Sequence, residues 1–222
     1  PLIWGIAINC SRASTGRSDP RLALDRALAA ARATDRPLLY GLRQPDDWSF
    51  ADQLELLRPG DVVTYTYRRE PLGIVAAGHV RPEVIAARER GVLFDVGHGM
   101  TSLDFNELEA ALGDGFPPDT FSTDGYARHV GSVPQHDLPR TMSKLLAAGM
   151  PENDIFQAVT SRPASVLGLA DTVGGLRPGS PADLTLLAFH DDSAPLVDVH
   201  EQTRPGGCWE AVLTVCGGEP VG

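Results

Sequence analysis

The sequence predicts an α/β fold in which short buried strands alternate with helices. Apolar runs of strand length recur along the first 125 residues, and apolar residues recur at helical spacing on the polar segments between them. Strands that alternate with helices form parallel sheets with right-handed crossovers. The clearest unit is 92–125, where two apolar runs that end near His98 and Asp124 enclose a helix-like segment.

The individual elements follow from the same pattern and from local stop signals. Asp19 and Pro20 are a typical N-cap and first helical residue, while Pro59-Gly60 and Gly91 are typical of helix ends. We expect strands at 2–9, 37–42, 61–67, 92–98 and 119–124. We expect helices from Asp19-Pro20 onward, then at 50–57, 81–90, 103–112, 138–148 and 151–160, with a continuation over 161–167.

The character of the chain changes near residue 170. Glycine-rich turns and alternating apolar runs replace the helical spacing, for example over 183–189 and 208–216. We therefore expect one α/β unit at 1–170 and a small β appendage at 171–222.

Composition narrows the class of protein. The chain has 222 residues, 42% of them hydrophobic, and a formal net charge of −10. Such a charge argues against nonspecific nucleic acid binding, and no apolar run approaches the roughly 20 residues that cross a bilayer. Three cysteines without framework spacing and no visible signal peptide suit the cytoplasm. The chain begins with Pro1 rather than Met, so it could be a processed product or a fragment.

Strand spacing alone leaves two topologies open. Five strands precede the tail, whereas a closed (β/α)8 barrel has eight. The sheet is therefore either open and doubly wound, or part of a barrel whose first strands are missing. No glycine-rich phosphate loop follows the first strand, which argues against a dinucleotide-binding fold.

Four motifs resemble the amidohydrolase superfamily, most closely its dihydroorotase-like deacetylase branch. They are GVLFDVGHG, PDTFSTDG, DLPRTMSKLLAAGMP and VTSRPASVLGLADTVGGLRPGSPADLTLL. The resemblance implies a distorted (β/α)8 TIM-type barrel that carries one or two divalent metals such as zinc, with a small β-sandwich built from both termini. On this view, 1–170 are barrel strands four to eight, and 171–222 are a β-sandwich segment. The first three strands and their His-x-His pair lie outside the chain.

The resemblance also implies which positions hold metal. The strand-four lysine, usually carbamylated, falls on Ala7, and the histidines of strands five and six fall on Tyr40 and Tyr65. A second histidine often found nearby falls on Arg68. Only the strand-eight aspartate is kept, as Asp124. Because a catalytic zinc site needs about three protein ligands, this chain is not expected to bind metal tightly.

Five side chains at strand ends are the candidate site. We expect Asp124 to be the catalytic residue and metal ligand. We expect His98, Tyr40, Tyr65 and Arg68 to contact substrate, and all five to converge on one cavity.

Ordinary structural roles compete with these assignments. Asp124 could cap a loop, and His98 could hydrogen-bond to backbone. His129 and His136 lie in a polar loop and are expected to be solvated. Cys10 follows a strand but has no paired base in the sequence, so a nucleophilic role is disfavoured.

Three functions from different classes remain. The first is a hydrolase of amide or cyclic amide C–N bonds, with Asp124 as metal ligand and general base. The second is a catalytically inactive relative that binds a ligand or a protein partner. The third is a non-metal chemistry that uses Asp124, His98, Tyr65 and Arg68. The expected partners are a small-molecule substrate and the missing N-terminal barrel segment. Unpaired sheet edges at 2–9 and 118–123 also favour self-association, for example as a homo-oligomer.

Overall fold

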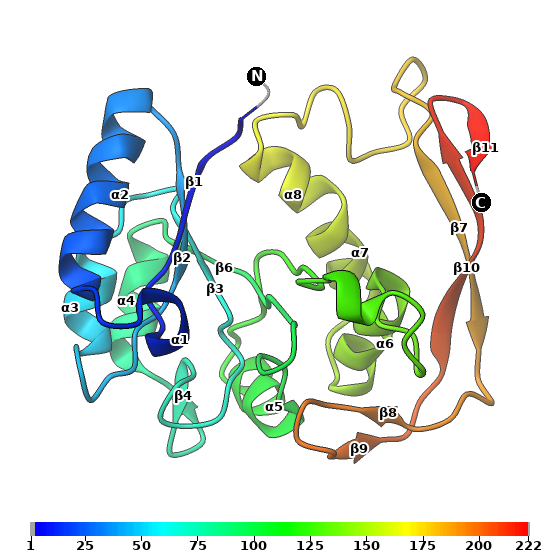
Figure 1. Cartoon of the computed structure of the whole chain (residues 1–222). Coiled ribbons are helices and arrows are strands. Elements are labelled where there is room, and N and C mark those ends of the chain that lie inside the picture. Colours follow the sequence, from blue (N-terminus) through cyan, green and yellow to red (C-terminus); the bar gives the residue numbers. More distant parts are fainter. Residues whose placement is uncertain (1–2, 222) are drawn as a thin grey trace.

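A four-stranded parallel sheet forms the centre of the larger part of the molecule (Figure 1). The computed structural model describes residues 3–221, so Leu2 of the first expected strand lies outside the described residues. The strands stand in the order β1-β2-β3-β6, and each neighbouring pair is parallel. Their bounds are β1 Ile6–Asn9, β2 Leu38–Gly41, β3 Val62–Thr64 and β6 Leu93–Phe94. The expected α/β class with a parallel sheet is confirmed.

Helices connect the strands much as the sequence predicts. Asp19, Ser49 and Asp104 each accept a backbone hydrogen bond as N-caps of α2, α3 and α5. Figure 1 shows α2 and α3 on one side of the sheet, and α6, α7 and α8 toward the C-terminal strands. The bounds are α2 Pro20–Thr34, α3 Phe50–Glu55, α4 Pro82–Glu89, α5 Phe105–Gly113, α6 Leu138–Ala147, α7 Glu152–Val159 and α8 Ser161–Val166.

The strand expected at 119–124 is not a regular strand. Its only ladder pairing is an isolated parallel bridge between Asp95 and Thr120. The segment nevertheless runs beside residues 94–99, since the amides of His98 and Gly99 donate to the carbonyls of Ser122 and Thr123. The prediction was right about the position of this segment and wrong about its regular strand structure. At its end, the backbone of Asp124 turns into the left-handed region (φ 46°). The strands expected at 61–67 and 92–98 are also shorter than predicted.

Several loops contain short elements that periodicity could not predict. The loop after β1 holds α1 Arg12–Thr15, and the loop after β3 holds the hairpin β4 Val75–Ala76 and β5 His79–Val80. A 3-10 turn, η1 Ala127–His129, follows Asp124. Each is four residues or fewer, which is below the length at which an apolar period is visible.

The C-terminal part consists mainly of antiparallel strands. The strands β7 Leu184–His190, β10 Cys208–Cys216 and β11 Glu219–Val221 form an antiparallel sheet in the order β11-β10-β7. A second small pair, β8 Leu196–Val197 and β9 Thr203–Arg204, lies to the right of α5 at the bottom of Figure 1. The sheet is anchored to the helices: the Trp209 amide donates to Ser143 Oγ at 2.8 Å, and its ring lies 5.4 Å from that of Phe156.

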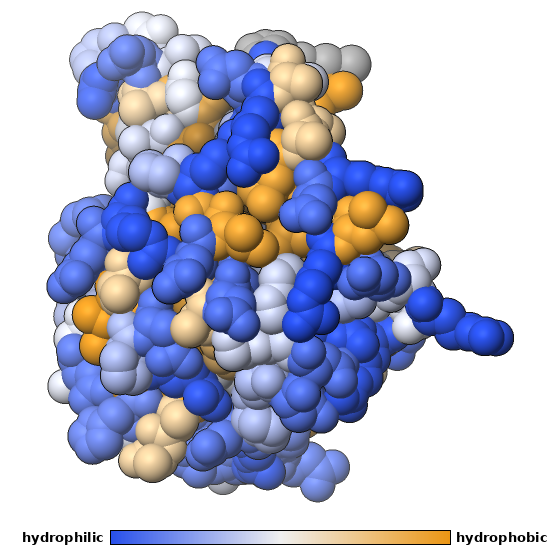
Figure 2. All heavy atoms as spheres, turned by 90° about the vertical axis from the view of Figure 1, so that its left-hand side faces the viewer, coloured by the Kyte–Doolittle hydropathy of each residue, from blue (hydrophilic) through white to orange (hydrophobic). Residues whose placement is uncertain are grey.

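The surface is not uniformly hydrophilic despite the charge of −10. Figure 2 shows the left-hand side of Figure 1, where apolar atoms gather in a band across the upper half of a mainly hydrophilic face. Within residues 3–221, no helix combines the length and apolarity that a membrane crossing requires.

Candidate active site

The C-terminal ends of the parallel strands meet at one edge of the sheet. Because β1, β2, β3 and β6 run in the same direction, the residues that follow them are brought to the same side. Polar side chains from 10–12, 40–47, 65–68 and 95–98 therefore share this edge. The segment 120–124 joins them through its hydrogen bonds to 96–99.

Tyr65 and Asp124 form the strained centre of this edge. Both are non-glycine residues in the left-handed region, with φ of 63° and 46°. Such conformations cost on the order of 1–3 kcal/mol each and cluster at functional sites. Burial first, then the negative charge of Asp124, raises the pKa of the Tyr65 hydroxyl, so the phenol stays protonated. A side chain at Gly99 would meet Asp124 Oδ2 at 2.6 Å, so glycine is what admits the carboxylate here.

Arg68 follows Tyr65 by three residues, in the segment after β3. Its Nε is buried and has no hydrogen-bond partner among the described residues. Burial lowers the pKa of its guanidinium, and the Tyr65 hydroxyl is the neighbour that favours the charge. Tyr65 and Arg68 thus lie in one segment after β3, and whether they form one site with Asp124 stays a prediction.

Asp95 fixes the backbone around these residues. Its buried carboxylate accepts hydrogen bonds from the hydroxyls of Thr64 (2.8 Å), Thr120 (2.9 Å) and Ser122 (2.8 Å). Burial raises its pKa and these hydroxyls oppose the rise. One side chain therefore ties β3 and β6 to the segment that ends in Asp124.

His98 points into the protein interior. Its Nδ1 donates to the Gly99 carbonyl at 2.8 Å, so its Nε2 accepts from the Lys144 ammonium at 2.8 Å. Burial, then the charge of Lys144, lowers the pKa of His98 to about 3. Burial also lowers the pKa of Lys144 to about 8. Both ring nitrogens are engaged by protein groups, so none is free for a substrate in this conformation.

Two further histidines form a row of ring contacts with His98. The His98 and His136 rings lie 4.8 Å apart, and those of His136 and His129 lie 4.0 Å apart. His136 is partly buried, with Nε2 at 2.8 Å from the Thr123 carbonyl. Neither histidine is simply a free surface side chain, since ring contacts and the hydrogen bond of His136 hold this loop against the segment that carries Asp124.

Tyr40 is buried in the core, where its hydroxyl donates to Gln53 Oε1 at 2.8 Å. Gln53 also accepts from the Arg43 amide and donates to the carbonyls of Arg43 and Trp48. Burial raises the pKa of the neighbouring Cys10 thiol, which is the opposite of what a nucleophile needs. The ends of β1 and β2 are thus locked by internal hydrogen bonds.

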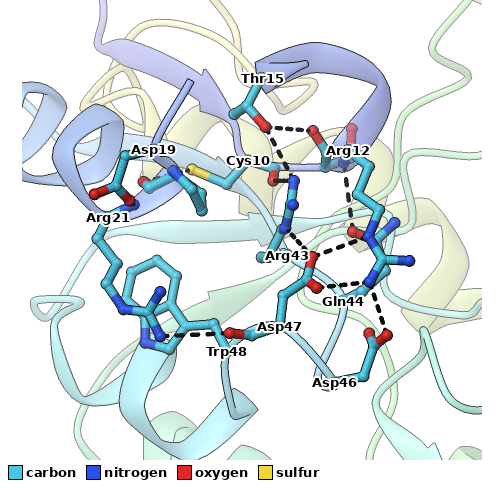
Figure 3. Close-up of polar contacts among 12 residues, drawn as sticks. Cys10, Arg12, Thr15, Asp19, Arg21, Arg43, Gln44, Asp46, Asp47 and Trp48 are labelled. Carbon is cyan, nitrogen blue, oxygen red and sulfur yellow. Dashed lines mark hydrogen bonds and ion pairs between the residues drawn. The ribbon is translucent and has the colours of Figure 1, made fainter. Parts of the chain in front are cut away.

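A network of ion pairs and hydrogen bonds joins the segments that follow β1 and β2 (Figure 3). Arg43 donates to Asp47 at 2.7 Å, to Thr15 Oγ1 at 3.0 Å and to the Cys10 carbonyl at 3.3 Å. Arg12 donates to Asp47 and to Asp46. Its guanidinium is the main reason that the pKa of Asp47 lies below its ordinary value. Each polar group near Arg43 is engaged, in contrast to those near Arg68.

The described residues do not fit a metal centre by themselves. They contain no group of three or more His, Cys, Asp or Glu side chains that could hold an ion. At the expected ligand positions stand Ala7, the hydrogen-bonded Tyr40, and Tyr65. Amidohydrolases generally use divalent metals, so this donor set departs from the family pattern.

A large cavity lies away from these residues. It has a volume of about 750 Å³ and is mainly apolar, between α6, α7, β7 and β10. Its lining includes Met142, Phe156, Leu187 and Ala211. None of the five predicted site residues lines it.

Comparison with known proteins decides the family. The model of the amidohydrolase family matches residues 84–218 of this chain. This chain belongs to the amidohydrolase family. A deacetylase of Enterococcus faecalis is 33% identical over 175 residues, which cover 75% of this chain and 46% of that protein. A crystal structure of an adenine deaminase is similar with a TM-score of 0.88, 29% identity, and coverage of 98% of this chain and 59% of that one. A dihydroorotase structure follows with a TM-score of 0.82, 28% identity, and coverage of 99% and 59%.

The chain therefore spans about half the length of the curated relatives that it matches. The family matches the sequence-based resemblance, which is confirmed. Lys144, Asp95 and Gln53 are polar residues of this edge that the sequence-based analysis did not single out. For Lys144 a signal existed, since it lies between Met142 and Leu145 on the buried face of α6.

Proposed function

We propose that this protein hydrolyses amide or cyclic amide C–N bonds at the edge formed by Tyr65, Arg68 and Asp124. The observation that carries the proposal is the strained backbone of Tyr65 and Asp124, which lie at the ends of β3 and of the segment 120–124. Membership in the amidohydrolase family and the deacetylase relatives support the bond type.

In this proposal Asp124 is the general base. It takes a proton from a water molecule, whose oxygen bonds to the amide carbon. The carbon–nitrogen bond then breaks, and the proton passes to the leaving nitrogen. The raised pKa of Tyr65 keeps its hydroxyl protonated, so it can donate a hydrogen bond to the oxygen that becomes negative. Arg68 contacts the substrate. His98 does not react in this proposal, and its contact with Lys144 holds it in the interior next to the site.

The assignment of 1–170 to barrel strands four to eight, and of 171–222 to the sandwich, belongs to the same proposal. It is supported by the parallel order of β1, β2, β3 and β6 and by the separate antiparallel sheet of the tail. The upstream barrel strands are then the natural partner of the open edge at β1. No catalytic step here passes through a metal, since the described donor set does not fit one.

Two measurements on the same preparation test the proposal. Elemental analysis after dialysis against a chelator should find far less than one equivalent of zinc or manganese. Release of the amine from a panel of N-acyl amino acids and cyclic amides should be detected, and should be lost in Asp124→Asn. Turnover that survives in Asp124→Asn would refute the assignment of the base. A protein that binds these compounds without turnover would instead be an inactive relative, for which Tyr40 and Tyr65 at ligand positions would be the reason.

A further inference from the structure

The one lysine of the chain is buried. Of the 19 lysine and arginine residues, Lys144 is the only lysine, and 8% of it is exposed on α6. Its hydrogen-bond partner is a neutral ring, that of His98, at 2.8 Å. A buried ammonium beside a neutral group is destabilising. Since the chain otherwise uses arginine as its cation, a primary amine at this position points to a local requirement.

The contacts of His98 fix the orientation and the tautomer of its ring. The Gly99 carbonyl can only accept a hydrogen bond, so Nδ1 carries the proton and Nε2 is left as an acceptor. The ammonium of Lys144, a compact donor on a flexible stem, donates to that Nε2. The ring of His136 lies edge-on at 4.8 Å. The His98 ring is therefore held by three neighbours.

The turn that carries His98 contacts both Tyr65 and Asp124. Gly97 and Gly99, on either side of His98, have left-handed backbones with φ of 54° and 46°. A β-carbon at Gly97 would lie 3.0 Å from the amide nitrogen of Tyr65 and from its ring atom Cδ1. A β-carbon at Gly99 would lie 2.6 Å from Asp124 Oδ2. One short turn thus packs against both strained residues of the proposed site.

The same turn is hydrogen-bonded to the segment that ends in Asp124. The amides of His98 and Gly99 donate to the carbonyls of Ser122 and Thr123, each at 3.0 Å. A shift of the His98 ring would move the Gly99 carbonyl that accepts from it, and with it the Asp124 carboxylate that packs against Gly99. The contact of His98 with α6 is therefore coupled to the position of the proposed base.

We propose that Lys144 is a positioning residue for the reaction, which acts through the His98 turn on Tyr65 and Asp124. This inference rests on the proposed function and adds a residue of α6 to it. The ammonium holds the His98 ring, the ring holds the Gly99 carbonyl, and the turn sets where the Asp124 carboxylate and the Tyr65 ring lie. Reacting groups need such support, because a displacement of about 1 Å can lower a rate by about a hundredfold.

The test replaces Lys144 by methionine, which keeps an unbranched side chain and removes the donor. The NMR signals of the Gly97, Gly99 and Asp124 amides report on the turn, and we expect them to shift in Lys144→Met. Turnover of the panel of N-acyl amino acids and cyclic amides should show kcat lowered by about tenfold or more, with KM changed by less than about twofold.

Ser143→Ala is the control on the same helix. Ser143 is buried beside Lys144 in sequence, but its hydroxyl accepts from the amide of Trp209, which lies in the C-terminal sheet, at 2.8 Å. This substitution should lower the melting temperature and leave the amide signals of the turn and kcat unchanged. Coupling is tested in a His98→Asn background, where Lys144→Met should lower kcat further by less than about twofold, because the two residues act as a unit.

The tautomer of His98 provides a measurement on the parent protein alone. The ring nitrogen signals in NMR spectra should show a proton on Nδ1 and a bare Nε2, since the Gly99 carbonyl and the Lys144 ammonium require this form. A neutral His98 ring with its proton on Nε2 would overturn the contact on which the inference depends.

The outcomes separate this inference from the proposed function. Unchanged amide signals in Lys144→Met overturn the inference whether or not the protein hydrolyses amides. Additive effects of Lys144→Met and His98→Asn on kcat overturn the route through His98. Loss of the cooperative melting transition in Lys144→Met shows a residue needed for folding and overturns the inference as well. Shifted signals in a protein whose parent has no turnover support the positioning role and count against the proposed function.

Discussion

The two halves of the strand-end edge differ in whether their buried arginine is paired. At the ends of β1 and β2, Arg43 is engaged by Asp47, Thr15 and the Cys10 carbonyl, above a buried Tyr40–Gln53 pair. At the end of β3, Arg68 has an unpartnered Nε beside a phenol. In the first half, the polar side chains hydrogen-bond to one another. In the second half, Tyr65 and Asp124 have strained backbone conformations and the charge of Arg68 is unpaired. Strain and unsatisfied groups are destabilising, so their concentration in one half indicates where ligand binding is expected.

The largest effect expected from breaking the locked half is at Gln53. This fully buried side chain makes four hydrogen bonds, to the Tyr40 hydroxyl, the Arg43 amide and carbonyl, and the Trp48 carbonyl. Gln53→Leu should lower the free energy of unfolding by about 4 kcal/mol, since it leaves several buried groups unpaired. Urea unfolding followed by circular dichroism measures this. Asp52→Ala, one residue earlier on α3, is the control and should cost much less. A loss below about 1 kcal/mol for Gln53→Leu would mean that the lock is not cooperative.

The second effect concerns pH and the His98–Lys144 contact beneath the open half. The pKa of His98 is about 3 when folded, against 6.5 for an ordinary histidine. Between these values the unfolded chain binds the proton more readily, so the free energy of unfolding should fall as pH drops from about 6.5 toward 3. The loss attributable to this group is at most about 5 kcal/mol.

Because carboxylates also titrate in that range, the informative quantity is the difference between the parent and His98→Asn. The parent should lose more stability than His98→Asn between pH 6.5 and 4. Parallel stability curves for the two proteins would contradict the neutral, buried assignment of His98.

A smaller effect tests the influence of Asp124 on Tyr65. Asp124→Asn keeps the side-chain shape and suits a left-handed backbone, so stability should change by less than about 1 kcal/mol. The negative charge of Asp124 raises the pKa of Tyr65, so the substitution should lower that pKa. Titration of the tyrosine ring carbons by NMR measures it. An unchanged Tyr65 pKa in Asp124→Asn would mean that the two side chains do not interact, and would count against the proposed site.

The sequence predicted the elements better than the contacts between them. Asp19, Pro20 and Gly91 marked helix boundaries correctly because capping is a local property. The segment that ends in Asp124 was placed correctly but is irregular. Its partner, residues 94–99, pairs with it through scattered hydrogen bonds rather than a ladder. Local propensity carries no information about such pairing.

The same difference between local and tertiary features applies to the candidate site residues. The sequence predicts Tyr65, Arg68 and Asp124 at one edge because strand ends share an edge in a parallel sheet, and their joint role in a site stays a prediction. Tyr40 and His98 follow the same rule, yet their polar atoms are taken by Gln53 and Lys144. Lys144 lies 46 residues after His98, and only the tertiary fold brings the two together. Whether Tyr40 and His98 contact a substrate stays a prediction.

The contrast between the two arginines can be measured directly through stability. Arg43→Met and Arg68→Met are the matched substitutions, compared by urea unfolding at pH 7 without ligand. Arg43→Met should lower the free energy of unfolding by about 1–2 kcal/mol, because the hydrogen bonds of a largely buried guanidinium are lost. Arg68→Met should leave it unchanged or raise it by up to about 1 kcal/mol, because an unsatisfied cation is replaced by an apolar side chain of similar length. If Arg68→Met is as destabilising as Arg43→Met, Arg68 is a structural residue and the open half is not a ligand site.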